Sequence, residues 1–498
     1  MKLIITTLAI KTSLIFIAVF ISCNNVKENK LVQTQKYVYD YYKNDKLKLR
    51  AAKFLLDNMN GNFHIENGHA IADISTMEPK TIIRNIDSTF KASQYLLNNK
   101  SISFDDFLEF VLPYRINFSK DDDWKNLISK NTKNHIENKK LNNSKDIIEY
   151  INNTNKLILP DFKFDVANTH EDTLSYTDIF RQKKGSCITM AYMGQYYYRA
   201  LGIPVSFDYV LCWGNMAGAH TWNSLILQDH KLRPFLGLEQ QVTKYDPLLY
   251  YSGGKKYPSL STYKKAGKIY RHTYSLQRNS LAYKYKRTKI LPPLLQNYRS
   301  IDVTRQYHKV INLNTRKLFN NIKSKILLAC NYSSQEWIPI SAAEFKNNGY
   351  RFDELSTDML YLLSTYDKSS YKDVYYPFYI DSNGKILTLK PTKRKGNLII
   401  KYIKSIESDQ AIAKNAYVWE VAVAVAKNQL RTKPLIGQEY TLFLWQSGWK
   451  QISTISNLSN KELVFKNVPE NGLYLISSKE HSDDDRPFFI SNGAIKWL

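Results

Sequence analysis

Residues 181–223 read RQKKGSCITMAYMGQYYYRALGIPVSFDYVLCWGNMAGAHTWN, and this stretch decides how the middle of the chain is interpreted. Ser186 is a good helix-capping residue, and Cys187 follows it in the first turn of a predicted helix that ends at Gly202. The unpaired N–H groups and the positive dipole end at a helix start favour a thiolate. We therefore expect a nucleophilic cysteine at position 187, with a pKa below that of an ordinary thiol.

Two strands are predicted after this helix. From Val205 to Leu211 apolar residues alternate with polar ones, which is the period of a half-buried strand. A second strand, from Ala219 to Leu227, follows a glycine-containing turn and carries His220. Histidine is the commonest general base and acid, so His220 is the predicted partner of Cys187. Trp222, on the same strand, is expected to shape the site.

This order of helix, strand and strand, with cysteine at the helix start and histidine on the second strand, resembles the transglutaminase-like superfamily. That superfamily is a branch of the papain-type cysteine peptidase fold. The matching residues are Gly185 to Cys187, Arg199 to Pro204 and His220 to Asn223. The resemblance implies that the cysteine attacks an amide carbonyl, that the histidine takes the thiol proton, and that an acidic residue orients the imidazole.

The orienting acid departs from the pattern that the resemblance implies. It is expected about 15 residues beyond the histidine, where this chain has Phe235 (220 + 15). We assign the role to Glu239, the first carboxylate after the next strand, and keep Asp246 as the following candidate. Asn223 is disfavoured, because an odd offset along a strand turns its side chain away from the His220 face.

Three functions fit these residues. Cysteine-dependent acyl transfer at an amide is the first, with hydrolysis of a peptide or protein substrate as its simplest form. In the second, protein cross-linking, a lysine amine replaces water as the acyl acceptor. In the third, a non-catalytic surface protein uses a degenerate core to bind a glycan or protein partner; Cys187 is then a small buried hydrophobe and His220 a hydrogen-bonded core residue. No cofactor is expected, and no CxxC, HExxH or other zinc-type spacing predicts a metal site.

The N-terminal sequence MKLIITTLAIKTSLIFIAVFISC has the form of an export signal. It has a basic start at Lys2, an apolar run from Leu14 to Ile21 and a small residue before Cys23. It resembles a bacterial lipoprotein signal, which implies a signal peptide over residues 1–22 and a lipid on Cys23. The protein is therefore expected in the cell envelope, anchored by lipid to a bacterial membrane, with the outer membrane favoured. Residues 23–45 are polar and predict a tether.

Residues 46–160 predict a helical N-terminal domain. Ser103 to Asp106 forms a capping box, and apolar residues then recur at helical spacing up to Leu112, before Pro113 ends the run. The stretches Ala51 to Leu56 and Phe107 to Arg115 are similar to the helical region that precedes the transglutaminase-like core in lipoproteins of Bacteroidetes-type bacteria. The resemblance assigns no catalytic residue to this domain.

Short strands with turn signals dominate the C-terminal part. Tyr375 to Leu389 contains a hairpin around Asn383-Gly384, and Phe488 to Trp497 contains another around Asn492-Gly493. The resulting fold class is multidomain α+β. It has a helical N-terminal domain, a papain/transglutaminase-like core, and two β-sandwich-like modules. The predicted bounds of these last three units are 161–290, 296–402 and 403–498. Trp445 and Trp449 suggest a glycan platform, but core packing is favoured for them.

Composition limits the remaining possibilities. The chain has 498 residues, of which 43% are hydrophobic, and this length suits two to four folded domains. Its formal charge of +25 comes from lysines spread along the chain, so we expect a lysine-rich surface rather than a nucleic-acid site. Four cysteines do not make a disulfide framework in an exported protein of this size, and Cys212 and Cys330 are predicted to be buried free thiols.

Overall fold

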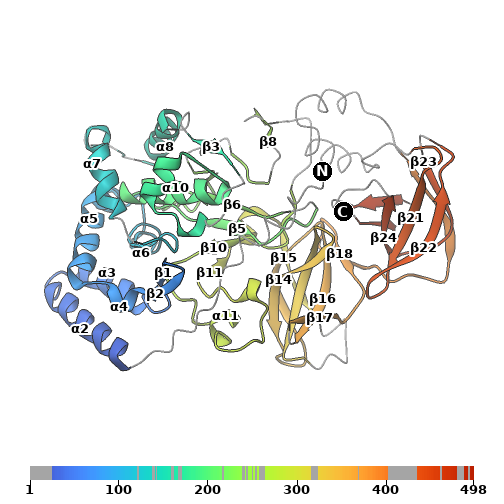
Figure 1. Cartoon of the computed structure of the whole chain (residues 1–498), viewed down its shortest axis with the longest axis horizontal. Helices are drawn as coiled ribbons and strands as arrows, with labels where there is room; N and C mark the ends of the chain where they lie inside the picture. The colour runs from blue at the N-terminus through green and yellow to red at the C-terminus, as the bar shows by residue number, and fades with distance from the viewer. Residues whose placement is uncertain are drawn as a thin grey trace.

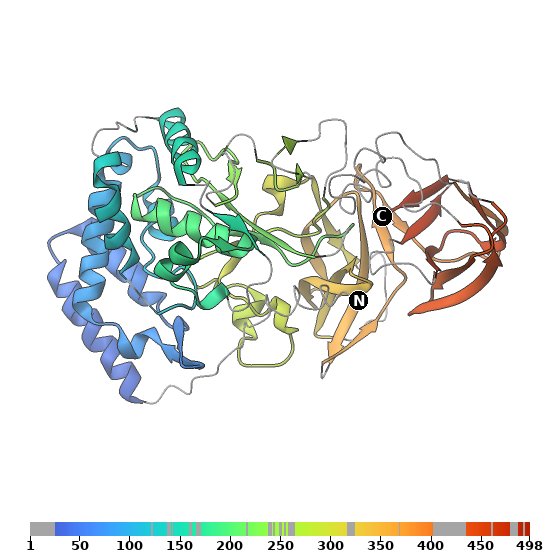
Figure 2. The same cartoon turned by 45° about the horizontal axis from the view of Figure 1, so that its top comes forward.

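The computed structural model is a mixed α+β structure with N-terminal helices, a mixed middle region and C-terminal antiparallel sheets. Figures 1 and 2 show these parts following one another along the long axis, from the blue helices to the red strands. The structure describes residues 25–498 except for 121–122, 137–140, 142, 159–161, 166–170, 216–217, 238–241, 243–244, 249–250, 253–254, 257–263, 316–323, 368, 402–434, 460–461, 479–486 and 492–493. The predicted signal with Cys23, and the proposed acid Glu239, therefore lie outside the described residues.

The N-terminal region is built from helices and one short hairpin. Its elements are α2 (Asn25–Tyr41), α3 (Lys46–Asp57), β1 (Phe63–Glu66), β2 (His69–Ala72), α4 (Asp73–Thr76), α5 (Pro79–Asn98), α6 (Phe104–Phe110), α7 (Trp124–Ile136) and α8 (Ser144–Ile158). Most of the predicted tether is helix α2 instead. Val38 and Tyr42, four residues apart and thus on one helical face, are buried, and Tyr42 donates a hydrogen bond to the Ile83 carbonyl at 3.1 Å. None of the described helices is long and apolar enough to cross a membrane.

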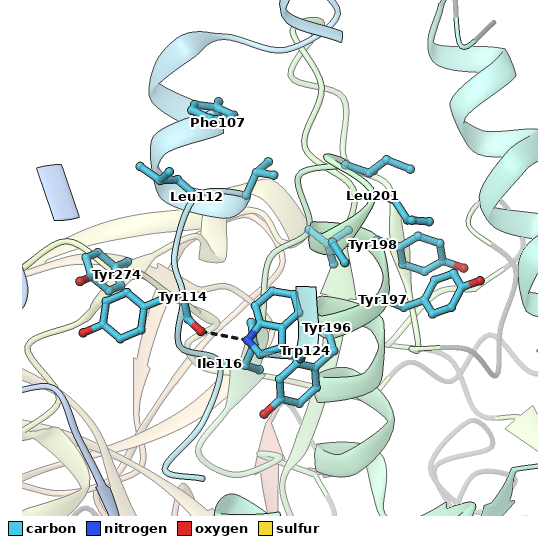
Figure 3. Packing of buried hydrophobic residues seen from close by; sticks show 14 of the residues in the cluster. Phe107, Leu112, Tyr114, Ile116, Trp124, Tyr196, Tyr197, Tyr198, Leu201 and Tyr274 are labelled. Atoms are coloured by element: carbon cyan, nitrogen blue, oxygen red, sulfur yellow. Dashed lines mark hydrogen bonds between the residues drawn. The ribbon is translucent and has the colours of Figure 1, made fainter. Parts of the chain in front are cut away.

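Ser103 caps the start of α6 as predicted, through one of the two hydrogen bonds of a capping box. The Ser103 hydroxyl accepts a hydrogen bond from the Asp106 backbone N–H at 3.0 Å, and Phe107 and Leu112 are fully buried. Figure 3 shows these two side chains above a cluster of aromatic rings, where the Trp124 indole donates to the Tyr114 carbonyl at 2.9 Å. The same hydrophobic cluster continues into Tyr196 of the central helix. The helical region and the middle region therefore share one core across the predicted boundary at 160.

The middle region sets helix α10 (Cys187–Ala200) against a five-stranded sheet of order β11-β10-β5-β6-β7. The strands are β5 (Asp208–Val210), β6 (His220–Ser224), β7 (Pro234–Phe235), β10 (Tyr270–His272) and β11 (Ser300–Asp302). Other elements here are η2 (Glu171–Thr173), α9 (Tyr176–Gln182), the parallel pair β3 (Lys163–Phe164) and β4 (Lys184–Gly185), β8 (Tyr251–Ser252), β9 (Lys255–Lys256), α11 (Leu281–Lys284), η3 (Pro293–Leu295) and α12 (Thr304–Tyr307). A Cβ on Gly194 would come within 2.5 Å of the Asn223 side chain, so the small residue is what lets α10 lie this close to β6.

The first predicted strand of this region is shorter and more buried than its alternation indicated. Only Asp208–Val210 forms β5, and the polar residues Ser206 and Asp208 are fully buried. Asp208 is paired there with Arg271 of the neighbouring strand β10, through two hydrogen bonds of 2.7 Å. A buried carboxylate is tolerated when it is paired and hydrogen-bonded, so both faces of this strand are covered.

Two antiparallel β units follow. In the first, β12 (Val310–Asn314) pairs with β15 (Arg351–Ser356), beside a sheet of β13 (Ile326–Ser333), β14 (Glu336–Glu344), β16 (Met359–Asp367), β17 (Ser370–Asp373), β18 (Phe378–Ile380) and β19 (Ile386–Thr388). In the second, β20 (Lys395–Lys401) pairs with β23 (Glu462–Pro469), beside a sheet of β21 (Glu439–Trp445), β22 (Trp449–Ser456), β24 (Leu473–Ser478), β25 (Phe488–Ser491) and β26 (Ala494–Trp497). Both predicted hairpins are present, as β18–β19 and β25–β26.

The unit boundaries differ from the predicted ones in two places. Strand β11 lies beyond residue 290 but belongs to the central sheet, and β20 lies before residue 402 but belongs to the last β unit. Trp445 is only 8% exposed, and Trp449 donates an indole hydrogen bond to the Tyr332 hydroxyl of the first β unit at 3.2 Å. These two tryptophans pack between the β units, so the core packing expected for them is confirmed.

Candidate functional site

Cys187 is the first residue of α10, as the sequence predicted. Ser186 caps the helix: its side-chain oxygen accepts the Ile188 backbone N–H at 3.1 Å. Cys187 is a partly exposed residue, whereas Cys212 and Cys330 are buried, and all three are free. The side chain packs against a cluster that includes Trp213, Trp222 and Tyr245.

Glu171 lies against the same helix start, a contact that no local pattern in the sequence predicts. Its carboxylate accepts the Ser186 backbone N–H at 3.0 Å and also the Ser186 hydroxyl. A carboxylate is favoured at a helix N-terminus by the unpaired N–H groups and by the dipole. The position that could stabilise a thiolate is therefore already partly occupied by a negative charge.

The expectation of a lowered thiol pKa is wrong for this structure. Burial raises the pKa of Cys187 above its ordinary value, and the Glu171 charge acts in the same direction. The backbone N–H and hydroxyl of Thr221, together with the Lys264 charge, lower that pKa but do not outweigh burial. The Thr221 hydroxyl oxygen is buried and makes no hydrogen bond of ordinary geometry, so its effect on the thiol is one of proximity. The helix start alone does not make this thiol acidic.

His220 begins strand β6 and is partly exposed. Its Nε2 atom is 2.7 Å from the Tyr245 hydroxyl, and its ring centre lies 6.1 Å from that of Trp213 and 5.8 Å from that of Trp222. Burial, and then the nearby Lys264 charge, lower the pKa of His220 to about 3. The imidazole is therefore neutral. Within the described part of the chain no direct hydrogen bond joins this ring to the Cys187 thiol, and such catalytic bonds are often loose before substrate binds.

The orienting position is filled by a hydroxyl group in this structure. Phe235 is fully buried and pairs with Asn223, three residues along β6 from the histidine, so this position does not face the imidazole. Glu239 lies outside the described residues, and its assignment stays a prediction. Tyr245 is the described residue that contacts His220 Nε2. Sequence reasoning missed it, because a loop residue 25 positions after the histidine carries no periodic signal.

Asn223 has a structural role, as its position along the strand indicated. Its amide nitrogen donates to the carbonyls of Ala191 at 3.0 Å and Ser206 at 2.9 Å, and its oxygen accepts the Gly237 N–H at 2.9 Å. A Cβ on Gly237 would lie 1.9 Å from the Met190 carbonyl oxygen. The amide therefore ties β6, α10 and the chain after β7 together behind the site.

Trp222 is fully buried beneath His220 rather than lining an open surface. Its indole N–H donates to the Tyr307 hydroxyl at 2.8 Å, and that hydroxyl donates to the Asp208 carboxylate at 2.7 Å. Arg271 completes the group by pairing with Asp208. Trp222 acts on the site through the position of its ring. A fixed indole gives the imidazole a rigid neighbour.

Two further residues near the site were not predicted. The Lys264 Nζ atom lies 5.4 Å from the centre of the Trp213 ring. Its charge lowers the pKa of both Cys187 and His220. The sequence marks Lys264 only as one lysine in a basic stretch. Among the described residues, no group of three or more His, Cys, Asp or Glu side chains could hold a metal ion.

Comparisons with known proteins give only distant matches. No protein-family model matches the sequence, and no curated protein matches it significantly. A solved structure from Cytophaga hutchinsonii, described as a candidate cysteine protease, is 17% identical with a TM-score of 0.20; the match covers 26% of this chain and 43% of that one, under half of that protein's length. Red sea bream transglutaminase is 10% identical with a TM-score of 0.20, over 82% of this chain and 78% of that one. The chain is thus distantly similar in structure to a candidate cysteine protease and to a transglutaminase.

Proposed function

We propose that the central region is a transglutaminase-like, papain-type core that performs cysteine-dependent acyl transfer at an amide, with peptide hydrolysis as its simplest form. The observation that carries this proposal is the juxtaposition of Cys187, at the start of α10, with Thr221 of β6, the strand that begins at His220. Cys187 and His220 are each partly exposed as residues, which is compatible with access of a substrate to this end of the sheet.

The Tyr245 contact decides which nitrogen of His220 can act. Nε2 is engaged by the tyrosine hydroxyl at 2.7 Å, which leaves Nδ1 for the thiol proton. A neutral imidazole accepts a proton on Nδ1 only in the tautomer that carries its hydrogen on Nε2. In that tautomer Nε2 donates to the Tyr245 oxygen. Tyr245 is therefore proposed to hold the reactive tautomer, which is the role that an acidic residue has in other triads.

The reaction then follows from these groups. His220 Nδ1 takes the proton of Cys187 as the sulfur attacks the amide carbonyl carbon, and the carbonyl oxygen becomes an oxyanion. Because the N–H groups of Ser186 and Ile188 already have side-chain acceptors, we assign the oxyanion to the Cys187 backbone N–H at the start of α10. The imidazolium returns its proton to the leaving amine, which departs as the C–N bond breaks. Water then attacks the thioester, loses a proton to His220 and releases the acid and the free thiol.

A raised thiol pKa and a neutral imidazole imply that the resting pair is uncharged. Proton transfer must then accompany attack, because no thiolate is formed beforehand. We expect turnover to increase with pH above neutrality, because deprotonation of the thiol then adds a second route in which the thiolate attacks directly.

The test uses the full chain in detergent and a mixture of fluorogenic peptides and denatured casein. Cys187→Ala and His220→Ala should each abolish cysteine-dependent cleavage, whereas Cys212→Ala, which removes a buried thiol, should retain it. Incorporation of a fluorescent primary amine into the casein, through a new amide bond in place of hydrolysis, would assign cross-linking instead. Cleavage that survives in Cys187→Ala would refute the proposed nucleophile.

One observation favours a non-catalytic alternative. His220 contacts a tyrosine rather than an acid in the described structure, and its pKa is lowered to about 3. A degenerate core that binds a glycan or protein partner would have no need of a reactive tautomer. This alternative predicts no turnover in the native chain, together with partner binding that Cys187→Ala leaves unchanged.

For location, we propose a lipid-anchored protein of the cell envelope, favouring the outer membrane, because of the Cys23 signal. Mass spectrometry of the mature N-terminus should find an acylated Cys23, and the protein should partition into detergent. Cys23→Ser should abolish the acylation. An intact N-terminus in the native protein would overturn the proposal.

A further inference from the structure

The loop that carries Lys264 is fixed against the hairpin turn that connects β5 to β6. The Lys264 backbone N–H donates to the Leu248 carbonyl at 2.6 Å, and the Lys265 carbonyl accepts the Gly214 N–H at 2.7 Å. The Asn215 side chain accepts the Lys265 N–H at 2.8 Å. These hydrogen bonds of the Lys264 and Lys265 backbone fix the position of the Lys264 Cα atom, from which its side chain extends.

From this anchor the Lys264 side chain extends over an aromatic ring next to the site. Its Nζ atom is 5.4 Å from the centre of the Trp213 ring, a distance at which a cation is attracted to the ring face. Trp213 in turn lies 6.1 Å from the His220 ring and shares a hydrophobic cluster with Cys187. The ammonium group is therefore held at the edge of the candidate site.

The charges that face Cys187 come from three elements. Glu171 of η2 is negative, Lys264 is positive, and His220 of β6 is neutral because its pKa is lowered to about 3. The charge of Asp246 also acts on Lys264 and raises its pKa, while burial lowers the pKa of Lys264 to about 8. Among the described residues that act on the thiol, Lys264 thus supplies the positive charge that the imidazole lacks.

We propose that Lys264, held over the Trp213 ring at the edge of this site, is the cation that stabilises the Cys187 thiolate in place of an imidazolium. The proposal rests on the proposed function for its catalytic meaning, although the effect on the thiol exists without any substrate. As the thiol loses its proton, to His220 Nδ1 or to water, the new negative charge on sulfur faces a fixed ammonium group. At pH 7, below its pKa of about 8, Lys264 keeps its proton during this step, so no bond to it forms or breaks.

Lys265 offers a matched control on the neighbouring position. It has the same charge and chain length, but its Nζ atom pairs with Asp358 of the first β unit at 2.9 Å. Replacing it removes a positive charge from the same loop without removing the charge that acts on Cys187. Any general effect of net charge or loop stability should therefore be common to both lysine variants.

The experiment measures how fast Cys187 is alkylated by iodoacetamide between pH 6 and 10 in the full chain, with modification quantified by mass spectrometry of the Cys187 peptide. Iodoacetamide is neutral, so its rate reports the thiolate fraction rather than attraction of the reagent. We expect Lys264→Gln to slow alkylation at pH 7 about twofold, because the Lys264 charge acts on the thiol more weakly than burial or the Glu171 charge. Lys264→Arg, which keeps the charge, should restore most of the rate, and Lys265→Gln should match the native chain.

Each outcome decides the proposal. Equal rates for Lys264→Gln and the native chain, or equal slowing by Lys265→Gln, would overturn it. If Lys264→Gln fails to fold, the Cys187 alkylation rate of Lys264→Arg is compared with that of the native chain. A rate close to native supports the proposal, since retaining the charge would not rescue a residue that only packs. Lysine-dependent alkylation without any peptide cleavage would retain this role and reject the proposed hydrolysis. Peptide cleavage that Lys264→Gln leaves unaffected would reject this role of Lys264 and retain the proposed hydrolysis.

Discussion

The Glu171 carboxylate accepts the backbone N–H of Ser186 at 3.0 Å, directly before the cysteine at the start of α10. This relationship places a negative charge at the end of the helix where a reactive thiolate would benefit from a positive one. Burial is the main reason why Cys187 has a raised pKa in a position that is usually associated with acidic thiols, and the Glu171 charge adds to it. The helix start is stabilised at the cost of thiol reactivity.

Removing that charge should make the thiol more reactive. Glu171→Gln keeps an oxygen that can accept the Ser186 N–H but removes the carboxylate charge. We expect Cys187 alkylation at pH 7 to become about threefold faster, because removing the Glu171 charge lowers the pKa of the thiol. Asp172→Asn is the control: its carboxylate accepts the Tyr192 hydroxyl at 2.5 Å and does not act on the thiol. Slower alkylation in Glu171→Gln would contradict this electrostatic account.

The Tyr245 hydroxyl should matter for turnover and little for folding. Tyr245→Phe removes the group that contacts His220 Nε2 at 2.7 Å, so the ring loses the bond that selects its tautomer. We expect kcat to fall on the order of 10²-fold, with KM nearly unchanged, since general base catalysis contributes 10²–10⁴-fold. Tyr361→Phe loses a comparable hydrogen bond, to the Ser356 carbonyl, far along the chain and should retain activity. Full activity in Tyr245→Phe would remove the tyrosine from the mechanism.

Stability should decrease between pH 6.5 and about 4. Burial lowers the pKa of His220 and of His272 to about 3, and that of His308 to about 4, whereas an unfolded histidine titrates near 6.5. In this interval the unfolded chain binds protons that the folded chain does not, so protonation favours unfolding as the pH falls. The melting temperature should therefore fall over this range, and less steeply in His272→Gln. The exposed His69 serves as control: His69→Gln should leave the slope unchanged. A flat profile would contradict the assignment of neutral buried histidines.

The Tyr307 hydroxyl should stabilise the floor of the site. It accepts the Trp222 indole N–H at 2.8 Å and donates to Asp208 at 2.7 Å, so Tyr307→Phe leaves a buried donor and a buried carboxylate each short of a partner. We expect a loss of about 1–3 kcal/mol in unfolding free energy, measured by urea denaturation. Tyr371→Phe, at a position 45% exposed, should change stability by less than about 0.5 kcal/mol. Equal values for the two variants would argue against the network.

Sequence reasoning recovered the features that depend on near neighbours. Ser186 caps α10, Cys187 begins it, and Ser103 caps α6. The two C-terminal hairpins lie where Asn-Gly pairs predict them. Each of these signals lies within a few residues, because capping and turn geometry are determined by local backbone hydrogen bonds and allowed dihedral angles. The coarse order of helices, mixed region and β units followed from the same local signals.

The tertiary structure decided the chemistry around the thiol. Glu171, Tyr245 and Lys264 reach the site from η2 and from two loops, and no periodicity in the chain links them to Cys187 or His220. The pairing of Asp208 with Arg271, 63 residues apart, likewise turned a polar strand face inward. The sequence determined that a cysteine would stand at a helix start and a histidine on the strand beside it. Only the folded chain determined their charges, because desolvation and distant partners set a pKa and neither is a local property of the sequence.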